Sequence, residues 1–134
     1  MALEISHRER EGVDLLDLKG RITVGAEVAS FRAAVEQIAG NPPRLIINMK
    51  EIDYVDSTGL GALVMCSTRI TKLNGAAKLV QVNRRNIELL VMTKIDTIFD
   101  IFDDEIDAVN SFFPGRAIKR FDILSFVRHM DDDD

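Results

Sequence analysis

The sequence predicts an α/β sandwich in which helices pack on a mixed β-sheet. Three observations predict it: the chain has 134 residues, 46% of them are hydrophobic, and short apolar runs alternate with amphipathic segments after an opening hairpin. This length fits one domain with a single substantial core. Strands that alternate with helices imply parallel pairing after the hairpin, because each helix carries the chain back across the sheet.

Each element has a local reason in the sequence. Alternating apolar and polar residues around a turn at 11–13 predict the hairpin, and helical spacing of apolar residues ended by Gly40 predicts the first helix. An apolar run after the turn at 41–43 predicts a buried strand, and the remaining segments repeat helix and strand patterns. The result is a sheet of about four to five strands with about four helices. The expected strands are 3–9, 13–20, 44–50, 77–82 and 99–102, and the expected helices are 25–40, 58–74, 84–94 and 103–113.

The helix over 58–74 is expected to bury one side. Its apolar stripe consists of Leu60, Leu63, Cys66, Ile70 and Leu73. Cys66 lies within this stripe, so we expect a small buried side chain and not a redox sensor.

Residues 114–134 read as an extension beyond a domain of residues 1–113, and they end in an acidic "DDDD" tail. If the segment after Gly115 is helical, its apolar residues share one face, but residues 121–127 could equally form a strand. It carries so many apolar residues that we expect it to dock on the domain or on a second copy, which would make a homodimer. The apolar residues in question are Ile118, Phe121, Leu124 and Val127.

Composition narrows the classes of function. A net charge of −5 argues against nucleic acid as a partner, since phosphate contacts need clustered Lys and Arg. The chain has one cysteine and neither an apolar run long enough to span a membrane nor an N-terminal signal core. His7 and His129 lack metal-ligand spacing. We therefore expect a cytoplasmic protein with no cofactor, no metal and no membrane partner.

The stretch "DYVDSTGLGALV", residues 53–64, raises the question of what Ser57 does. A nucleophilic serine needs a base and an oxyanion site, but the two histidines lie near the chain ends and the stretch is not G-x-S-x-G. We therefore expect no catalytic residue. A simpler alternative is that Asp56 or Ser57 only caps the helix that follows.

A nucleotide site is the second alternative for this stretch. Gly59 and Gly61 follow a strand and open a helix, as in a dinucleotide-binding fingerprint. However, Val64 stands where the third glycine would be, and Leu79 stands where an acid would hold the ribose. Close packing of the helix on the sheet explains these glycines better.

The exposed side of the same helix favours a third interpretation. Counting by helical spacing from Ser57 gives Gly61, then Val64 or Met65, then Thr68, which together form a low and adaptable surface. Such a surface is typical of protein binding, although it could also pack beneath the C-terminal segment. A phosphate on Ser57 would add about −1.5 to −2 charge, which a helix N-terminus tolerates but a partner shaped for a hydroxyl does not. The sequence thus predicts a phosphorylation switch.

The stretch resembles the signature of the STAS domain, and above all that of the free-standing anti-sigma-factor antagonists. The similarity continues through "RLIINMKEIDYVDSTGLGAL", "KLVQVNRRNIELLVMTKIDTIFDIF" and "DDEIDAV", from about residue 3 to 112. It implies a STAS domain over 1–113 that is not an enzyme, with Ser57 as phosphoacceptor. It also implies that Asp56, Thr58, Gly59 and Gly61 belong to the surface that binds the partner. The partners implied are an anti-sigma factor that is also an ATP-dependent serine kinase, and a serine phosphatase.

One departure from the family pattern concerns Thr23. Many members carry G-x-[LI]-D after the second strand, and the acid helps to engage the kinase, whereas this chain has Gly20-Arg21-Ile22-Thr23. Thr23 is therefore a partner-binding candidate with altered chemistry, and Glu27 is the nearby acid. The rival hypotheses are a non-switching STAS scaffold subunit of a stressosome-like or lipid-transport assembly and, less favoured, a nucleotide-binding protein.

Overall fold

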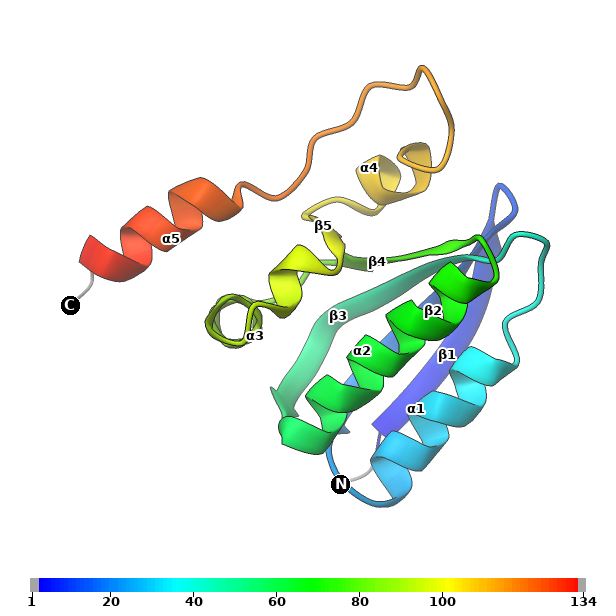
Figure 1. Ribbon diagram of the computed structural model, residues 1–134, viewed down its shortest axis with the longest axis horizontal. Coiled ribbons are helices and arrows are strands. Elements are labelled where there is room, and N and C mark those ends of the chain that lie inside the picture. Colours follow the sequence, from blue (N-terminus) through cyan, green and yellow to red (C-terminus); the bar gives the residue numbers. More distant parts are fainter. Residues whose placement is uncertain (1–2, 133–134) are drawn as a thin grey trace.

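The computed structural model describes residues 3–132 and shows the predicted α/β architecture (Figure 1). Every expected strand and helix forms, and the extension adds a further helix. The strands are β1 Leu3–Arg10, β2 Val13–Ile22, β3 Arg44–Val55, β4 Ala76–Val80 and β5 Asp100–Phe102. The helices are α1 Ala26–Glu36, α2 Ser57–Lys72, α3 Arg84–Met92, α4 Glu105–Asn110 and α5 Ile123–Asp132, with a 3-10 turn, η1, at Ile95–Thr97.

The strands form one mixed five-stranded sheet in the order β1-β2-β3-β4-β5. β1 pairs antiparallel with β2, and the other neighbours pair in parallel. This confirms the parallel pairing predicted from the sequence. A helix between two strands reverses the direction of the chain twice, so the two strands run the same way. All parallel strands therefore end at the same edge of the sheet.

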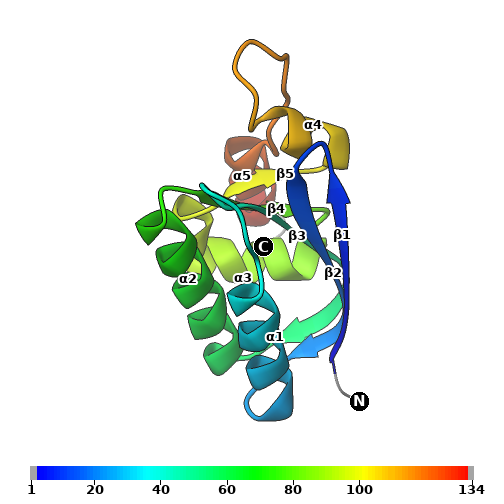
Figure 2. The same ribbon diagram turned by 90° about the vertical axis from the view of Figure 1, so that its right-hand side faces the viewer.

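The two faces of the sheet carry separate apolar clusters. Helices α1, α2 and α3 lie together on one side of the strands (Figure 2), and their buried residues form the main core with β2 and β3. Helix α4 covers the opposite face through Ala108 and Val109, which pack with Val13, Ile46 and Phe102. Within the described residues, no helix is long and apolar enough to cross a membrane.

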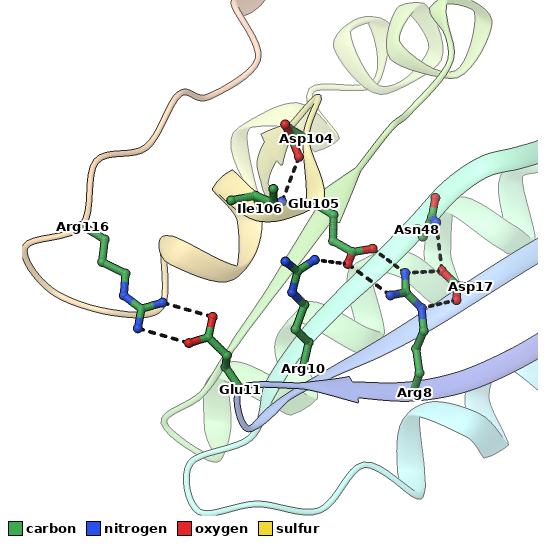
Figure 3. Close-up of polar contacts among 9 residues, drawn as sticks. All are labelled: Arg8, Arg10, Glu11, Asp17, Asn48, Asp104, Glu105, Ile106 and Arg116. Atoms are coloured by element: carbon green, nitrogen blue, oxygen red, sulfur yellow. Dashed lines mark hydrogen bonds and ion pairs between the residues drawn. The ribbon is translucent and has the colours of Figure 1, made fainter.

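A polar network ties α4 to the opening hairpin on this second face (Figure 3). Arg8 Nε donates to Asp17 Oδ2 at 2.6 Å, and Arg8 also pairs with Glu105 of α4. Arg10 donates to Glu105 Oε2 at 2.9 Å, and the Asn48 side chain donates to Asp17 at 2.8 Å. The hydrogen bonds from Arg8 hold the pKa values of the Asp17 and Glu105 carboxyl groups below their usual range.

Three predicted helix ends were wrong. The helix expected over 25–40 ends at Glu36, with Gln37 as its C-cap, so it stops before Gly40. Leu73 does not belong to the apolar stripe of α2: it caps the helix C-terminus and is 48% exposed. The chain turns at Asn74, which has positive φ, and Gly75 lies against Pro43, so the helix cannot continue there. The helix expected over 103–113 is shorter, because α4 ends at Asn110 and the rings at 112–113 pack back on the second cluster.

The extension docks on its own domain. Residues 116–122 form an extended segment, the strap, that leads from the α4 end of the domain to α5 (Figure 1). Helix α5 lies next to α3, where Phe126 contacts Arg84. The Phe121 amide donates to the Ile101 carbonyl at 2.8 Å, so the strap covers part of the edge strand β5. The expected helical face of four apolar residues does not form, since Ile118 and Phe121 precede the helix and Leu124 is 66% exposed. Phe121, Ile123 and Phe126 instead pack against the main core.

Candidate functional site

Ser57 is the first residue of α2 and lies where β3 ends, at the carboxyl edge of the parallel strands. Ligands of open α/β sheets bind outside this edge, where loops from several strands meet. The Ser57 side chain is exposed, and its hydroxyl has no hydrogen-bond partner among the described residues. The hydroxyl is therefore accessible and has no structural role of its own.

Asp56, not Ser57, caps the helix. Its Oδ1 accepts from the Gly59 amide at 2.7 Å, which satisfies one of the unpaired N–H groups at the start of α2. Its Oδ2 accepts from the Val24 amide at 2.9 Å, which fixes the loop between β2 and α1 beside the helix. The hydrogen bonds from Val24 and then from Gly59 lower the pKa of the Asp56 carboxyl.

The two glycines of the stretch differ in their surroundings. A Cβ on Gly59 would lie 2.0 Å from the Ile22 carbonyl oxygen, so this buried glycine lets α2 approach β2. A Cβ on Gly61 would meet no atom within 4 Å, and Gly61 is exposed. The packing explanation is thus confirmed for Gly59 but does not account for Gly61.

The exposed side of α2 carries most of the predicted binding residues. Thr58 and Gly61 are exposed, and Met65 is 58% exposed. Val64 is half-buried and packs against the main core, so Met65 is the more accessible of the two apolar candidates. The described part of the extension does not cover Met65 or Gly61, because its docked residues contact the β5 edge and the α3 side of the domain.

The loop after β2 lies next to the start of α2. Thr23 is half-buried, and its carbonyl accepts from the Val28 amide at 3.1 Å in the first turn of α1. The next residue, Val24, is 67% exposed and is held near Ser57 by Asp56. No sequence pattern singles out Val24, because its position depends on a hydrogen bond between segments that are distant in the chain.

Sequence reasoning also missed a groove beside Ser57, between the start of α2 and α3. The groove has a volume of about 340 Å³, and its lining combines apolar side chains with one cation, Arg85. The guanidinium carbon of Arg85 lies 5.9 Å from the centre of the Tyr54 ring, which is within the range of a cation–π contact. The Asn83 and Asn86 side chains support this part of the fold by donating to the Ile52 carbonyl at 2.9 and 3.0 Å. The residues that line the groove are Tyr54, Val55, Asp56, Ser57, Leu60, Arg85, Asn86, Glu88, Leu89 and Met92.

Other candidate groups are engaged in structural contacts. Cys66 is buried as expected, and burial raises the pKa of its thiol to about 12. His7 Nε2 lies 2.7 Å from Asp14 Oδ1, and His129 Nδ1 lies 2.8 Å from the Ser125 carbonyl oxygen. Within the described part of the chain, no group of three or more His, Cys, Asp or Glu side chains could hold a metal ion.

Comparison with known proteins agrees with the fold and with the signature. The family model of the STAS domain matches residues 4–108. The anti-sigma-B factor antagonist of Bacillus subtilis is 29% identical over 101 residues, which cover 75% of this chain and 92% of that protein. The anti-sigma-F factor antagonist RsfB of Mycobacterium tuberculosis is 26% identical over 110 residues, which cover 81% of this chain and 90% of the relative.

A solved antagonist shares the fold. The anti-sigma factor antagonist SpoIIAA in its unphosphorylated form superposes with a TM-score of 0.66 at 17% identity, over 81% of this chain and 96% of that chain. The phosphorylated form of Bacillus SpoIIAA gives a TM-score of 0.62 at 13% identity, over 81% and 99% of the two chains.

Proposed function

The chain belongs to the STAS domain family, and from this premise we propose that it is an anti-sigma-factor antagonist switched by phosphorylation of Ser57. The unphosphorylated chain binds an anti-sigma factor that is also a serine kinase, and this binding releases a sigma factor. Phosphorylation ends the interaction, and a serine phosphatase restores it. The chain itself catalyses nothing and acts in the cytoplasm.

The position of the Ser57 hydroxyl carries this proposal. Asp56 caps α2 and Gly59 allows the close packing, so the exposed hydroxyl can be modified without loss of a structural contact. In the proposed transfer, Ser57 Oγ attacks the γ-phosphorus of ATP held by the kinase. The new O–P bond forms, the bond between the γ-phosphorus and the bridging oxygen breaks, and ADP leaves. The hydroxyl proton passes to a base of the kinase.

The surroundings of Ser57 support a protein partner. Two exposed apolar side chains lie near Ser57: Val24 in the loop beside α2, and Met65 on α2 itself. Gly61 lies between Ser57 and Met65 and has no side chain, so nothing projects between them that would keep a partner away. Thr23 contributes a hydroxyl where a carboxylate is expected, so contact with a partner at this point depends on hydrogen bonding and not on charge. A phosphate in the middle of this surface would face repulsion from Asp56 and would have to be desolvated on docking.

Affinity capture from native lysate tests the proposal, with the wild-type chain, Ser57→Ala, Ser57→Asp and Ser30→Asp as baits. Ser30 is an exposed serine of α1, so Ser30→Asp adds the same charge away from the site. We expect a serine kinase to be recovered with the wild type, Ser57→Ala and Ser30→Asp, and to be lost with Ser57→Asp. Added ATP should phosphorylate the captured wild type at Ser57.

A different pattern would contradict the switch. If all four baits recover the same assembly and Ser57 stays unmodified after ATP is added, phosphorylation does not control binding. The chain would then act as a scaffold subunit, and Ser57 would be an ordinary exposed residue at a helix start.

A further inference from the structure

We propose that Arg85 is the internal counter-charge of phosphorylated Ser57, and that its guanidinium holds the phosphate in the groove between α2 and α3. This inference rests on the proposed switch and names the residue that receives the modified side chain. It concerns the phosphorylated form of the chain and not the encounter with the kinase.

Ser57 and Arg85 come from different helices and line the same groove. Ser57 is the first residue of α2, and Arg85 is the second residue of α3. The groove has a volume of about 340 Å³. A water molecule takes about 30 Å³ of liquid, so a phosphoryl group can occupy this space without displacing the helices.

The Arg85 side chain is directed to the Ser57 side of α3. Its guanidinium carbon lies 5.9 Å from the centre of the Tyr54 ring, and Tyr54 is at the end of β3, just before the Asp56–Ser57 turn. Among the side chains that the structure describes, those of residues 3–130, no carboxylate pairs with Arg85. Glu88 also lines the groove, but its Oε1 accepts from Arg84 Nε at 3.2 Å. Arg85 is thus the available cation of the groove.

A phosphate at Ser57 needs such a cation. The Asp56 carboxyl next to it has a lowered pKa and stays ionised, so the phosphate adds its charge of about −1.5 to −2 beside an existing negative charge. A guanidinium offers paired N–H donors that match phosphate oxygens. Once Arg85 binds the phosphate, a partner can no longer use Arg85. Phosphorylation then changes two features of the docking surface: it adds a charge at Ser57 and it withdraws the cation of the groove.

The pH titration of the phosphate by ³¹P NMR tests this contact. The full chain is produced with phosphoserine encoded at position 57, alone and combined with Arg85→Gln, Arg85→Lys or Arg84→Gln. Arg84 is the matched control, because it is adjacent in the same helix but pairs with Glu88 and lies 5.6 Å from the Phe126 ring. We expect Arg85→Gln to raise the second pKa of the phosphate by about 0.5 to 1 pH unit, as a nearby unit charge should. Arg85→Lys should keep most of the wild-type value, and Arg84→Gln should shift it by less than about 0.2 unit.

The Nε–H resonance of Arg85 provides a second readout, and it should move between the Ser57 and phosphoserine forms of the wild type. Equal shifts of the phosphate pKa in Arg85→Gln and Arg84→Gln would overturn the proposal. Such a result would mean that the phosphate responds only to the loss of any positive charge from α3 and not to a contact with Arg85. An unmoved Arg85 resonance would overturn it as well. Since the phosphate is installed during synthesis, these outcomes leave the switch itself standing. Failure of the capture experiment would instead remove the switch whatever the titration shows.

Discussion

Gly59→Ala and Gly61→Ala should change the stability of the fold in opposite directions. The two glycines are separated by one residue in the same helix, and the same substitution adds one methyl group at each. Only the surroundings differ, so the pair separates a glycine that the fold requires from one that it does not.

The magnitudes follow from the contacts of the added Cβ. At position 59 it would lie 2.0 Å from the Ile22 carbonyl oxygen and 2.9 Å from Val55 Cγ1. The carbonyl oxygen belongs to the backbone, so α2 must shift away from β2, which costs about 3 kcal/mol. Alanine regains about 1 kcal/mol of helix propensity, and the net loss is about 2 kcal/mol. At position 61 the added Cβ meets nothing within 4 Å, so only the gain of about 1 kcal/mol remains.

Urea unfolding followed by circular dichroism measures both changes. We expect a lower midpoint for Gly59→Ala and a higher one for Gly61→Ala, with similar slopes. Equal effects of the two variants would refute the reasoning that close packing distinguishes them. Gly61→Ala should also weaken capture of the partner although it stabilises the fold, because it raises the surface between Ser57 and Met65. A stabilised Gly61→Ala variant with unchanged capture would remove Gly61 from the docking surface.

Three further predictions concern other parts of the chain. The hydrogen bonds from Val24 and Gly59 lower the folded pKa of Asp56, so its contribution to stability is present above about pH 4 and is lost as the pH falls through the folded pKa. Asp56→Asn should therefore flatten the acid side of a stability–pH profile, and an unchanged slope would contradict this role. Burial and a pKa of about 12 should keep Cys66 unreactive toward an aromatic disulfide reagent at neutral pH until the chain unfolds, and rapid labelling of the folded chain would disprove it. Phe126→Ala should lower the unfolding free energy by about 1–2 kcal/mol, less than for a fully buried ring, and no change would show that α5 is not docked in solution.

The sequence predicted the elements of the fold because their patterns are local. Hydrophobic periodicity located every strand and helix of the domain, and the alternation of strands and helices indicated the parallel pairing. The errors occurred where contacts between distant segments determine the local structure. Leu73 fits the helical spacing, but the approach of Gly75 to Pro43 ends the helix first. Ile118 and Phe121 fit the same spacing, but both are held by the domain before α5 begins.

The candidate site was predicted only in part for a related reason. The stretch around Ser57 is continuous in the chain, so its acid, hydroxyl and glycines were visible in the sequence. Val24 belongs to the loop after β2 and Arg85 to helix α3, and only the fold brings them near Ser57. No spacing rule within one helix or strand can predict such a groove.

The structure divides the signature stretch into residues that build the fold and residues that the fold leaves exposed. Asp56 satisfies the helix start and fixes the loop after β2, and Gly59 allows α2 to approach β2. Ser57 lies between them in the chain and takes part in neither task. A charge placed on Ser57 therefore changes the surface while the cap and the packing remain in place. This separation suits the proposed switch, because the fold then persists whether the phosphate is present or absent and only the docking surface changes.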